Sequence, residues 1–145
     1  MEKIVRENLY EFHKTGNPLK SLDLGYAAWV HSIFDACNIP RQKYCVENGR
    51  TYFFGNLYMW AYCPQVVELP SGLCTAGWLD LDKCTKLTEL PRGMIIGSWL
   101  GLTGCTNIKE LPDDLDVKRR ILVNDDQTEL IKFIKESKFK DKLNI

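Results

Sequence analysis

The side chains of this chain that could serve as nucleophiles, general bases or metal ligands are first of all its cysteines and histidines. The sequence contains six cysteines and two histidines, His13 and His31. A thiolate beside an imidazole can attack a carbonyl carbon, and sets of Cys and His can hold zinc. Both histidines stand well before Cys63, Cys84 and Cys105, and no Cys-x-x-Cys spacing occurs. We therefore predict neither a catalytic Cys–His pair nor a metal site, and no cofactor.

Asp80 and Asp82 are the second candidate for chemistry, because two carboxylates on one strand face can act as an acid–base pair in hydrolysis. Where the surrounding Leu-x-Leu string recurs, at Leu100–Leu102, the equivalent positions hold Gly101 and Thr103. The sequence also lacks a phosphate-binding loop, a dinucleotide fingerprint and a Gly-x-Ser-x-Gly turn. A solvated strand face explains the two carboxylates more simply, and we predict that the chain is not an enzyme.

The dominant spacing in the sequence is a 21-residue period. Three Leu-Pro pairs keep this spacing: Leu69-Pro70, Leu90-Pro91 and Leu111-Pro112. The other positions that keep it are apolar residues or cysteine: Val66, Leu87 and Ile108; Leu73, Met94 and Leu115; Leu79, Leu100 and Ile121; Leu81, Leu102 and Val123; Cys63, Cys84 and Cys105. A fixed period of this length is typical of proteins built from stacked units. The period gives three of the cysteines a structural explanation.

Each unit is expected to contain one short strand, and strands of successive units are expected to stack in parallel. In Trp78–Leu81 and Trp99–Leu102 every second residue is leucine, and alternate side chains of a strand point to opposite faces. The repeated prolines lack an amide hydrogen, which argues against helix at those positions. The same register, carried back without a gap, assigns the inward positions of an aromatic first turn to four residues: Tyr52, Phe54, Tyr58 and Trp60.

The pattern x-Leu-x-Leu-x-x-Cys-x-x-Leu-x-x-Leu-Pro, over roughly residues 50–124, resembles leucine-rich repeats. It is most similar to the short Leu-Pro type found in bacterial proteins and in related repeats of bacteriophage genomes. The N-terminal strings Arg6–Phe12 and Gly16–Lys20 also resemble the openings of phage-encoded proteins. The resemblance implies that Cys63, Cys84 and Cys105 form a ladder whose side chains hydrogen-bond along the turns.

The predicted fold is α+β: a short parallel β-solenoid, leucine-rich-repeat-like, with helical caps at both ends. The single domain, 1–145, divides into three parts: a helical N-terminal cap over 1–44, the repeat solenoid over 45–124, and a C-terminal capping helix over 125–145. Caps are expected because uncovered ends would expose unpaired strand edges.

Sequence signals place the helices of the two caps. A first helix is expected over about 2–14, and a second from Asn17-Pro18, where Asn caps the helix and Pro fits its first turn, to about Asn38. In the C-terminal cap, Asp126 with Glu129 three residues later resembles a capping box. Each cap is expected to cover one open turn of the repeat.

The charge balance argues against a nucleic-acid partner. Lys plus Arg and Asp plus Glu both number 19, so the formal net charge is zero and no overall field attracts a polyanion. The sequence has no apolar stretch of about 18 residues and no signal-peptide pattern, so we expect no membrane partner. We expect a cytoplasmic protein, or one of the host cytoplasm or virion if phage-encoded, with free thiols.

The outward positions of the predicted strands are the candidates for binding. If Leu79 and Leu81 point inward, then Trp78 and the two carboxylates that follow it point outward. We assign the partner-binding surface to eight residues: Leu57, Met59, Trp78, Asp80, Asp82, Trp99, Thr103 and Arg120. Tryptophan and arginine are enriched at binding hot spots. The alternative is that Trp78 and Trp99 lie beneath a cap or loop, whereas Trp29 is expected to contact the core or a cap.

These features predict a non-enzymatic module for protein–protein interaction, such as a phage or bacterial factor that binds a host protein through the strand face. The alternative is a structural subunit, of a virion or another assembly, that self-associates or packs on neighbouring subunits. A third and less favoured hypothesis is nucleic-acid binding through Lys118, Arg119, Arg120 and the lysine-rich C-terminal tail, which salt-sensitive binding would reveal. Repeat scaffolds bind whatever their variable surface complements, so the sequence does not name the partner.

Overall fold

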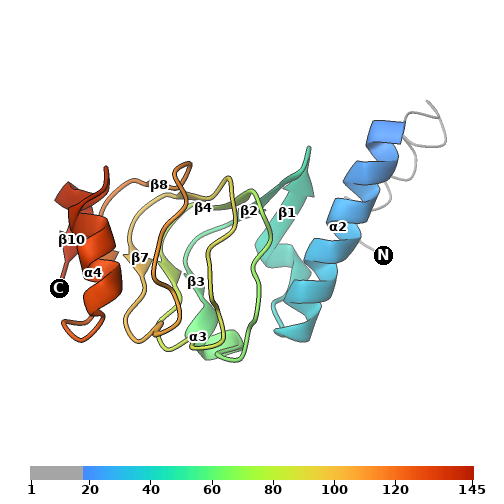
Figure 1. Ribbon diagram of the computed structural model, residues 1–145. Coiled ribbons are helices and arrows are strands. Elements are labelled where there is room, and N and C mark those ends of the chain that lie inside the picture. The colour runs from blue at the N-terminus through green and yellow to red at the C-terminus, as the bar shows by residue number, and fades with distance from the viewer. Residues whose placement is uncertain (1–17) are drawn as a thin grey trace.

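The computed structural model describes residues 18–145, with side chains from residue 25 onward, and has a mixed α/β fold with two parallel-rich sheets (Figure 1). The helices in this range are α2 (Pro18–Ala36), α3 (Met59–Tyr62) and α4 (Thr128–Lys135), with 3₁₀ turns η1 (Arg41–Lys43) and η2 (Lys140–Lys142). The strands are β1 (Tyr44–Glu47), β2 (Arg50–Phe53), β3 (Leu57–Tyr58), β4 (Leu73–Thr75), β5 (Leu79–Asp80), β6 (Ile95–Ile96), β7 (Leu100–Gly101), β8 (Asp116–Val117), β9 (Ile121–Leu122) and β10 (Leu143–Asn144). The helix expected over about 2–14 lies outside the described residues.

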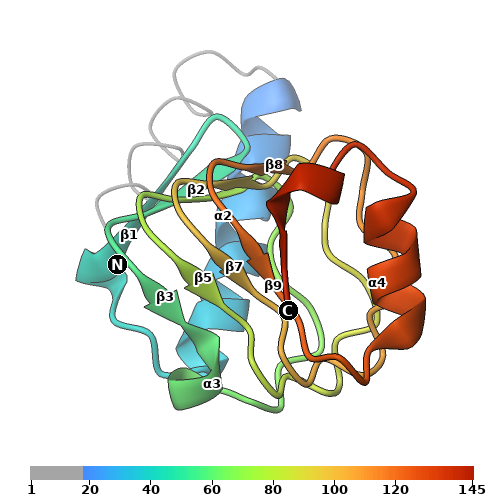
Figure 2. The same ribbon diagram turned by 90° about the vertical axis from the view of Figure 1, so that its left-hand side faces the viewer.

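The repeat period produces both sheets, because each unit supplies one strand to each. Sheet A has the order β1-β2-β4-β6-β8, and sheet B has the order β10-β9-β7-β5-β3. In sheet B, Leu79 lies opposite Leu100, and Leu100 lies opposite Ile121, in parallel pairs. Figure 2, seen from the C-terminal end, shows the two sheets as adjoining sides of the stack. The parallel stacking predicted around Leu79 and Leu100 is confirmed, whereas sheet A was not predicted.

The core is formed by the inward columns of the repeat. Eight of its side chains are 0% exposed: Leu73, Leu79, Leu81, Leu87, Met94, Leu100, Leu102 and Ile121. Burying one such side chain contributes roughly 1.5–3 kcal/mol relative to leaving it in water. Because every column runs through successive turns, a unit buries its apolar residues only when neighbours lie on both sides of it. The two end turns therefore need covers.

The register predicted for the first turn is wrong by one residue. Thr51 pairs with Leu73, and Leu57 pairs with Leu79, so this turn is one residue longer than the turns that follow it. A one-residue shift moves every side chain of a strand to the opposite face. The four aromatic residues assigned inward are therefore exposed by 37–58%: Tyr52, Phe54, Tyr58 and Trp60. The inward positions belong to four other residues, each at most 2% exposed: Thr51, Phe53, Leu57 and Met59.

The extra residue of the first turn lies in the one-turn helix α3. Cys63 is the fourth residue after Met59, whereas Cys84 is the third residue after Leu81 in the next unit. The helix Met59–Tyr62 contains the additional residue. At its C-terminal end, the backbone amide of Cys63 donates a hydrogen bond to Met59 O at 2.7 Å. After Cys63 the regular period returns, since Val66 and Leu69 are buried like their counterparts.

The N-terminal end of the stack is covered by α2 and by a hairpin (Figure 1). Ala27, Val30 and Phe34 are fully buried, and the Phe34 ring meets the Tyr44 ring edge-on at 4.6 Å between centroids. Strand β1 pairs antiparallel with β2 through Asn48-Gly49, whose φ angles are 52° and 72°. This dipeptide favours such tight hairpins because both residues tolerate positive φ. The last residues of the segment 1–44, predicted as a helical cap, therefore form the 3₁₀ turn η1 and the first residue of β1.

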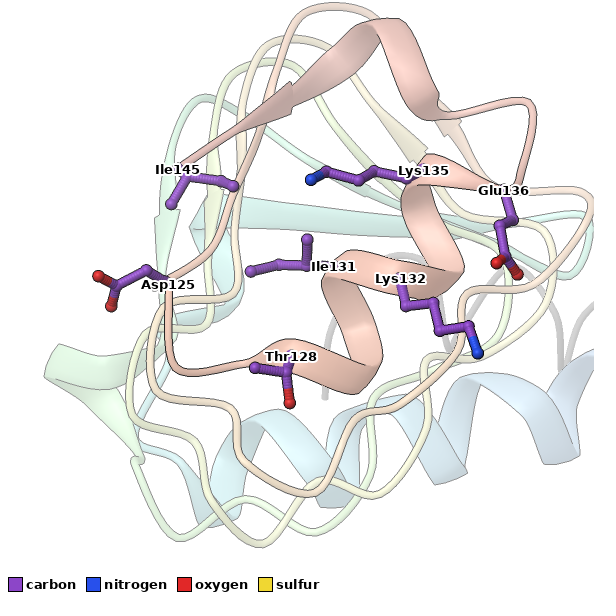
Figure 3. Close-up of a pocket in the computed structure, with 7 residues that line it drawn as sticks. All are labelled: Asp125, Thr128, Ile131, Lys132, Lys135, Glu136 and Ile145. Carbon is purple, nitrogen blue, oxygen red and sulfur yellow. The ribbon is translucent and has the colours of Figure 1, made fainter.

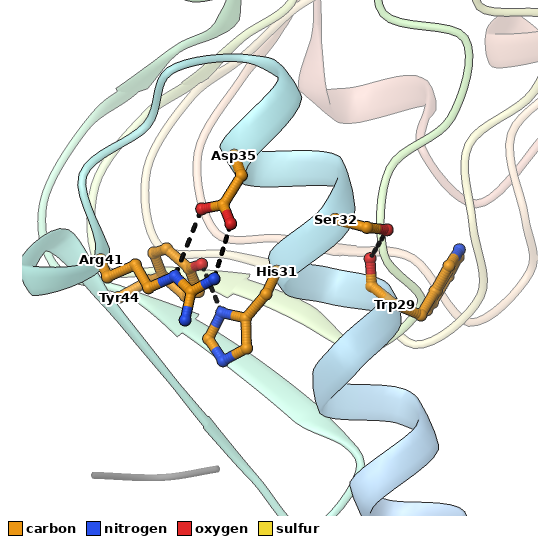
Figure 4. Close-up of polar contacts among 6 residues, drawn as sticks. All are labelled: Trp29, His31, Ser32, Asp35, Arg41 and Tyr44. Carbon is orange, nitrogen blue, oxygen red and sulfur yellow. Dashed lines mark hydrogen bonds and ion pairs between the residues drawn. The ribbon is translucent and has the colours of Figure 1, made fainter. Parts of the chain in front are cut away.

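Polar contacts fasten the end of α2 to β1 (Figure 4). His31 is buried, and its Nδ1 lies in a hydrogen bond 2.7 Å from the hydroxyl of Tyr44. Arg41 Nη2 lies 2.6 Å from Asp35 Oδ2, which joins the end of the helix to η1. The Arg41 hydrogen bond lowers the pKa of Asp35 below its usual range. The helix expected from Pro18 to about residue 38 is confirmed as α2.

The C-terminal end is covered by α4 and by a returning strand. Leu130 and Ile134 of α4 are buried, and after η2 the chain adds β10 parallel to β9, with Leu143 opposite Ile121. The segment 125–145, predicted as a capping helix, therefore contains a shorter helix and a strand. The predicted capping box is not formed: the residue before the helix is Gln127, and its side chain makes no cap hydrogen bond to α4.

Candidate functional site

The residues just before the strands of sheet B form one column on the outer side of that sheet. We call the outer side of sheet B the strand face, and we call this series the Trp column: Asn56, Trp78, Trp99, Arg120 and Lys142. Backbone bonds connect its members, since Leu79 N donates to Trp99 O at 3.0 Å and Leu100 N donates to Arg120 O at 2.9 Å. Trp78 is 41% exposed, and Trp99 is half-buried. In the described part of the chain, Trp78 therefore does not lie beneath a cap.

The two tryptophans of the column stack on each other. Their ring centroids are 5.5 Å apart and their planes differ by 18°. Parallel strands in register place equivalent residues about 4.8 Å apart, so the stack follows directly from the repeat. Aromatic pairs of this kind contribute roughly 0.5–1.5 kcal/mol beyond the area that they bury. On the other side of Trp78, the side chain of Asn56 accepts a hydrogen bond from Trp78 N at 2.8 Å. The stacked rings form a preorganised aromatic surface.

An acidic pair lies on the strand face beside the column. Asp80 Oδ1 accepts a bond from Asp82 N at 3.0 Å, and Asp82 Oδ1 accepts one from Thr103 N at 3.0 Å. Burial, and then the charge of Asp80, raise the pKa of Asp82 to about 6. Gly101 leaves the space for these groups, because a Cβ there would lie 2.9 Å from Asp82 Oδ1. The exposed Trp60 also joins the pair, with Nε1 donating to Asp80 Oδ2 at 2.9 Å.

The structure brings together six of the eight residues that were predicted to bind a partner: Trp78, Asp80, Asp82, Trp99, Thr103 and Arg120. Leu57 and Met59 were assigned to the exposed surface wrongly, because both are 0% exposed in the core. Their misplacement follows from the one-residue shift of the first turn. The outward residues there are Tyr58 and Trp60, which the ungapped register had assigned to the core.

Trp29 serves the N-terminal cap, as predicted. It is partly buried against the core, and its ring lies 5.8 Å from that of Tyr26 between centroids. Its Nε1 donates to Glu68 Oε1 at 3.2 Å, which ties α2 to the first turn. Trp29 is therefore not part of the strand face.

The cysteine series forms a partial ladder inside the turns. Cys105 Sγ donates to Leu81 O at 2.9 Å, whereas Cys84 is fully buried and Cys63 is half-buried. Burial, with the neighbouring Cys84, raises the pKa of Cys105 to about 12. Burial likewise raises the pKa of Cys84 to about 11, so neither thiol is a ready nucleophile. All six cysteines are free thiols.

Gln127 takes the ladder position after Cys105, a role that the cysteine spacing did not predict. Its Nε2 donates to Leu102 O at 2.8 Å, which is the carbonyl one period after the one that Cys105 contacts. Its Oε1 accepts from Asn124 N at 2.6 Å and from Gly104 N at 3.3 Å. The signal available in the sequence was its position. Gln127 stands 22 residues after Cys105, one more than the period, and the strand pairings of the first turn have the same 22-residue spacing.

A hollow of about 450 Å³ lies between α4 and the end of β10 (Figure 3). Its lining is mixed: Asp125, Thr128, Ile131, Lys132, Lys135, Glu136 and Ile145. Residues 18–145 contain no group of His, Cys, Asp or Glu side chains placed to hold a metal ion. Within the same range no helix has both the length and the hydropathy needed to span a bilayer.

Comparisons with protein-family models, with curated protein sequences and with solved structures find no match for this chain. The chemistry of the site therefore rests on its geometry. Stacked indole rings, a carboxylate pair and exposed cations lie along the strand face. Such an arrangement can bind a ligand through apolar, cation–π and charge-assisted contacts.

Proposed function

We propose that this chain is a short, leucine-rich-repeat-like solenoid that binds a protein partner through its strand face. The observation that carries the proposal is the Trp78–Trp99 stack, which stands on the outer side of sheet B with Trp78 41% exposed. An exposed tryptophan is costly to leave in water and is the residue type most enriched at binding hot spots.

Three further features support binding over a purely structural role. The backbone under the column is fixed by the parallel pairing of β5, β7 and β9, so little conformational freedom is lost on binding. Tyr58 and Trp60 extend the aromatic surface into the first turn. The aromatic residues are flanked by charged groups that provide a polar rim.

The test is affinity capture with the full chain as bait, followed by quantification of each captured protein. The double variant Trp78→Ala with Trp99→Ala should lose a partner that the wild type retains. Tyr52→Ala is the matched control, because Tyr52 is a 39% exposed aromatic residue on sheet A instead of sheet B. Circular dichroism should show that all the variants stay folded. A partner that is lost equally from the control and the double variant would contradict the proposal.

Light scattering of the free protein separates this proposal from self-association. If the protein is a monomer and iodide quenches the fluorescence of Trp78, the strand face is free in solution, which supports binding of a different protein. A mass that rises with concentration in the wild type, and not in the double variant, would instead assign the strand face to copies of this chain.

A further inference from the structure

A basic hollow of about 770 Å³ adjoins the Trp column at the C-terminal end of the strand face. Its wall consists of seven residues: Trp99, Lys118, Arg119, Arg120, Lys138, Asp141 and Lys142. Five of these side chains are cationic and one is a carboxylate, although the formal net charge of the whole chain is zero. Five of the 19 Lys and Arg residues thus lie close together, in the turn before β9, in η2 and in the turn before η2.

Two of the five cations in the hollow donate to main-chain oxygens. Arg120 Nη1 donates to the main-chain oxygen of Asp141 at 3.0 Å, and Lys138 Nζ donates to the main-chain oxygen of Asp113. Of these five cations, only Lys118 has an ion-pair partner among the described residues, Asp116 at 2.6 Å. Main-chain carbonyls orient a cation without cancelling its charge. The hollow thus keeps a net positive potential next to the open end of the tryptophan stack.

Charge changes sign along the strand face. Asp80 and Asp82 lie on and just after β5, and the cationic residues lie around β9 and β10, two or three strands away. With about 4.8 Å between strands, the two regions are roughly 10–15 Å apart. That separation exceeds the Debye length of about 8 Å at physiological salt, so salt largely screens the charges at one end from a ligand group at the other. A ligand lying along the column must be acidic only at its end in the hollow.

From this polarity we infer that the hollow binds an acidic segment of the protein partner, with Asp or Glu carboxylates on the cations and an apolar side chain on Trp99. The inference rests on the proposed function and adds the chemistry of the partner. A peptide can carry carboxylates at one end and none at the other. A single-stranded nucleic acid carries a phosphate at every nucleotide, so its backbone would continue toward Asp80 and Asp82. Arginine and carboxylate also match in geometry, since both can form two parallel hydrogen bonds.

The experiment uses dye-labelled probes and fluorescence anisotropy with the full chain. The probes are a short peptide with glutamates preceding a leucine, the same peptide with glutamine in place of glutamate, and oligothymidylate of similar length. We expect the glutamate peptide to bind tightest and to shift the tryptophan emission, with affinity falling as salt rises. Arg120→Glu with Lys142→Glu should weaken it about tenfold or more. Lys43→Glu with Lys86→Glu, two exposed lysines elsewhere, is the control of equal charge change and should leave binding near the wild-type level.

Three outcomes would overturn the inference: no binding of the glutamate peptide, equal binding of the glutamine peptide, or tighter binding of oligothymidylate, which would point to nucleic acid. The same variants separate this result from failure of the proposed function. If a captured partner is lost from the Trp78→Ala, Trp99→Ala variant but kept by Arg120→Glu with Lys142→Glu, the strand face binds protein and the acidic-segment inference alone is wrong. If neither variant loses a partner, the proposed function fails as well.

Discussion

The substitution Asp82→Asn should raise the stability of the protein at neutral pH and remove part of its pH dependence. Asp82 is half-buried on the strand face, and burial and the charge of Asp80 raise its pKa to about 6. Asparagine keeps an oxygen in the position that accepts the bond from Thr103 N at 3.0 Å. The substitution therefore removes the unfavourable charge without removing the acceptor.

The magnitude follows from the difference in pKa between the folded and unfolded states. An unfolded Asp has a pKa of about 3.9, so the folded protein binds this proton more tightly than the unfolded chain does. The resulting stabilisation is fully present below about pH 4 and is lost as the pH rises through about 6. A difference of about two units corresponds to about 3 kcal/mol, and because Asp82 keeps solvent contact we reduce this to about 1 kcal/mol.

The assay is urea unfolding, followed by tryptophan fluorescence, of wild type and Asp82→Asn at about pH 4 and about pH 7. The two proteins should be nearly equally stable at the lower pH, and the variant should be more stable by about 1 kcal/mol at the higher pH. Glu110→Gln is the matched control, because Glu110 is exposed and its change should leave the difference near zero at both values. A variant less stable than the wild type at neutral pH would refute the reasoning about Asp82.

Three further substitutions test separate parts of the fold by the same unfolding assay. Leu100→Ala empties a fully buried position of an inward column and should lower the free energy of unfolding by about 2–5 kcal/mol; a loss below about 1 kcal/mol would contradict the assigned core. Gln127→Ala removes the acceptor of the Asn124 and Gly104 amides and one of the two donors to Leu102 O, and should cost about 1–3 kcal/mol. Gly101→Val puts a Cβ 2.9 Å from Asp82 Oδ1 and should destabilise, whereas Gly25→Ala, with nothing within 4 Å of its Cβ, should not.

The parts of the fold that could be predicted from the sequence are those fixed by the period. A repeated spacing states which residues are equivalent, so it sets the pairing of Leu79, Leu100 and Ile121 without any knowledge of the turn geometry. It also sets the stacking of Trp78 on Trp99, because equivalent outward residues of parallel strands are neighbours.

The parts that could not be predicted lie where the period fails or the elements are too short to have a pattern. Strands β4, β6 and β8 of sheet A have only two or three residues each, and in β8 only Val117 is apolar and buried, so no alternating pattern can be recognised. Strand β10 has the same difficulty, since only Leu143 of its two residues is apolar. The hairpin between β1 and β2 did carry a signal, the Asn48-Gly49 dipeptide, but that signal does not say to which strand the hairpin then pairs.

The first turn shows why hydrophobicity alone misled the assignment. Tyr52 is aromatic and was assigned inward, whereas the inward position belongs to Thr51, a polar residue with 0% exposure. Thr51 is accommodated because its hydroxyl lies 2.9 Å from the hydroxyl of Tyr26 on α2. The burial of a polar group in the end turn therefore depends on a partner from the cap, and the repeat contains no information about it.

Equivalent positions in successive turns differ in how much their residue type varies, and this separates positions that maintain the fold from positions that are free to change. The inward position at the start of each sheet B strand is aliphatic in every turn: Leu57, Leu79, Leu100 and Ile121. The position just before it, in the Trp column, holds an amide, two indoles and a guanidinium in the same four turns. Backbone pairing is identical along both series, so the fold does not require this variation. A column that is variable in chemistry on a constant backbone suits the binding surface that we propose, and under that proposal changes in partner specificity are expected to lie here.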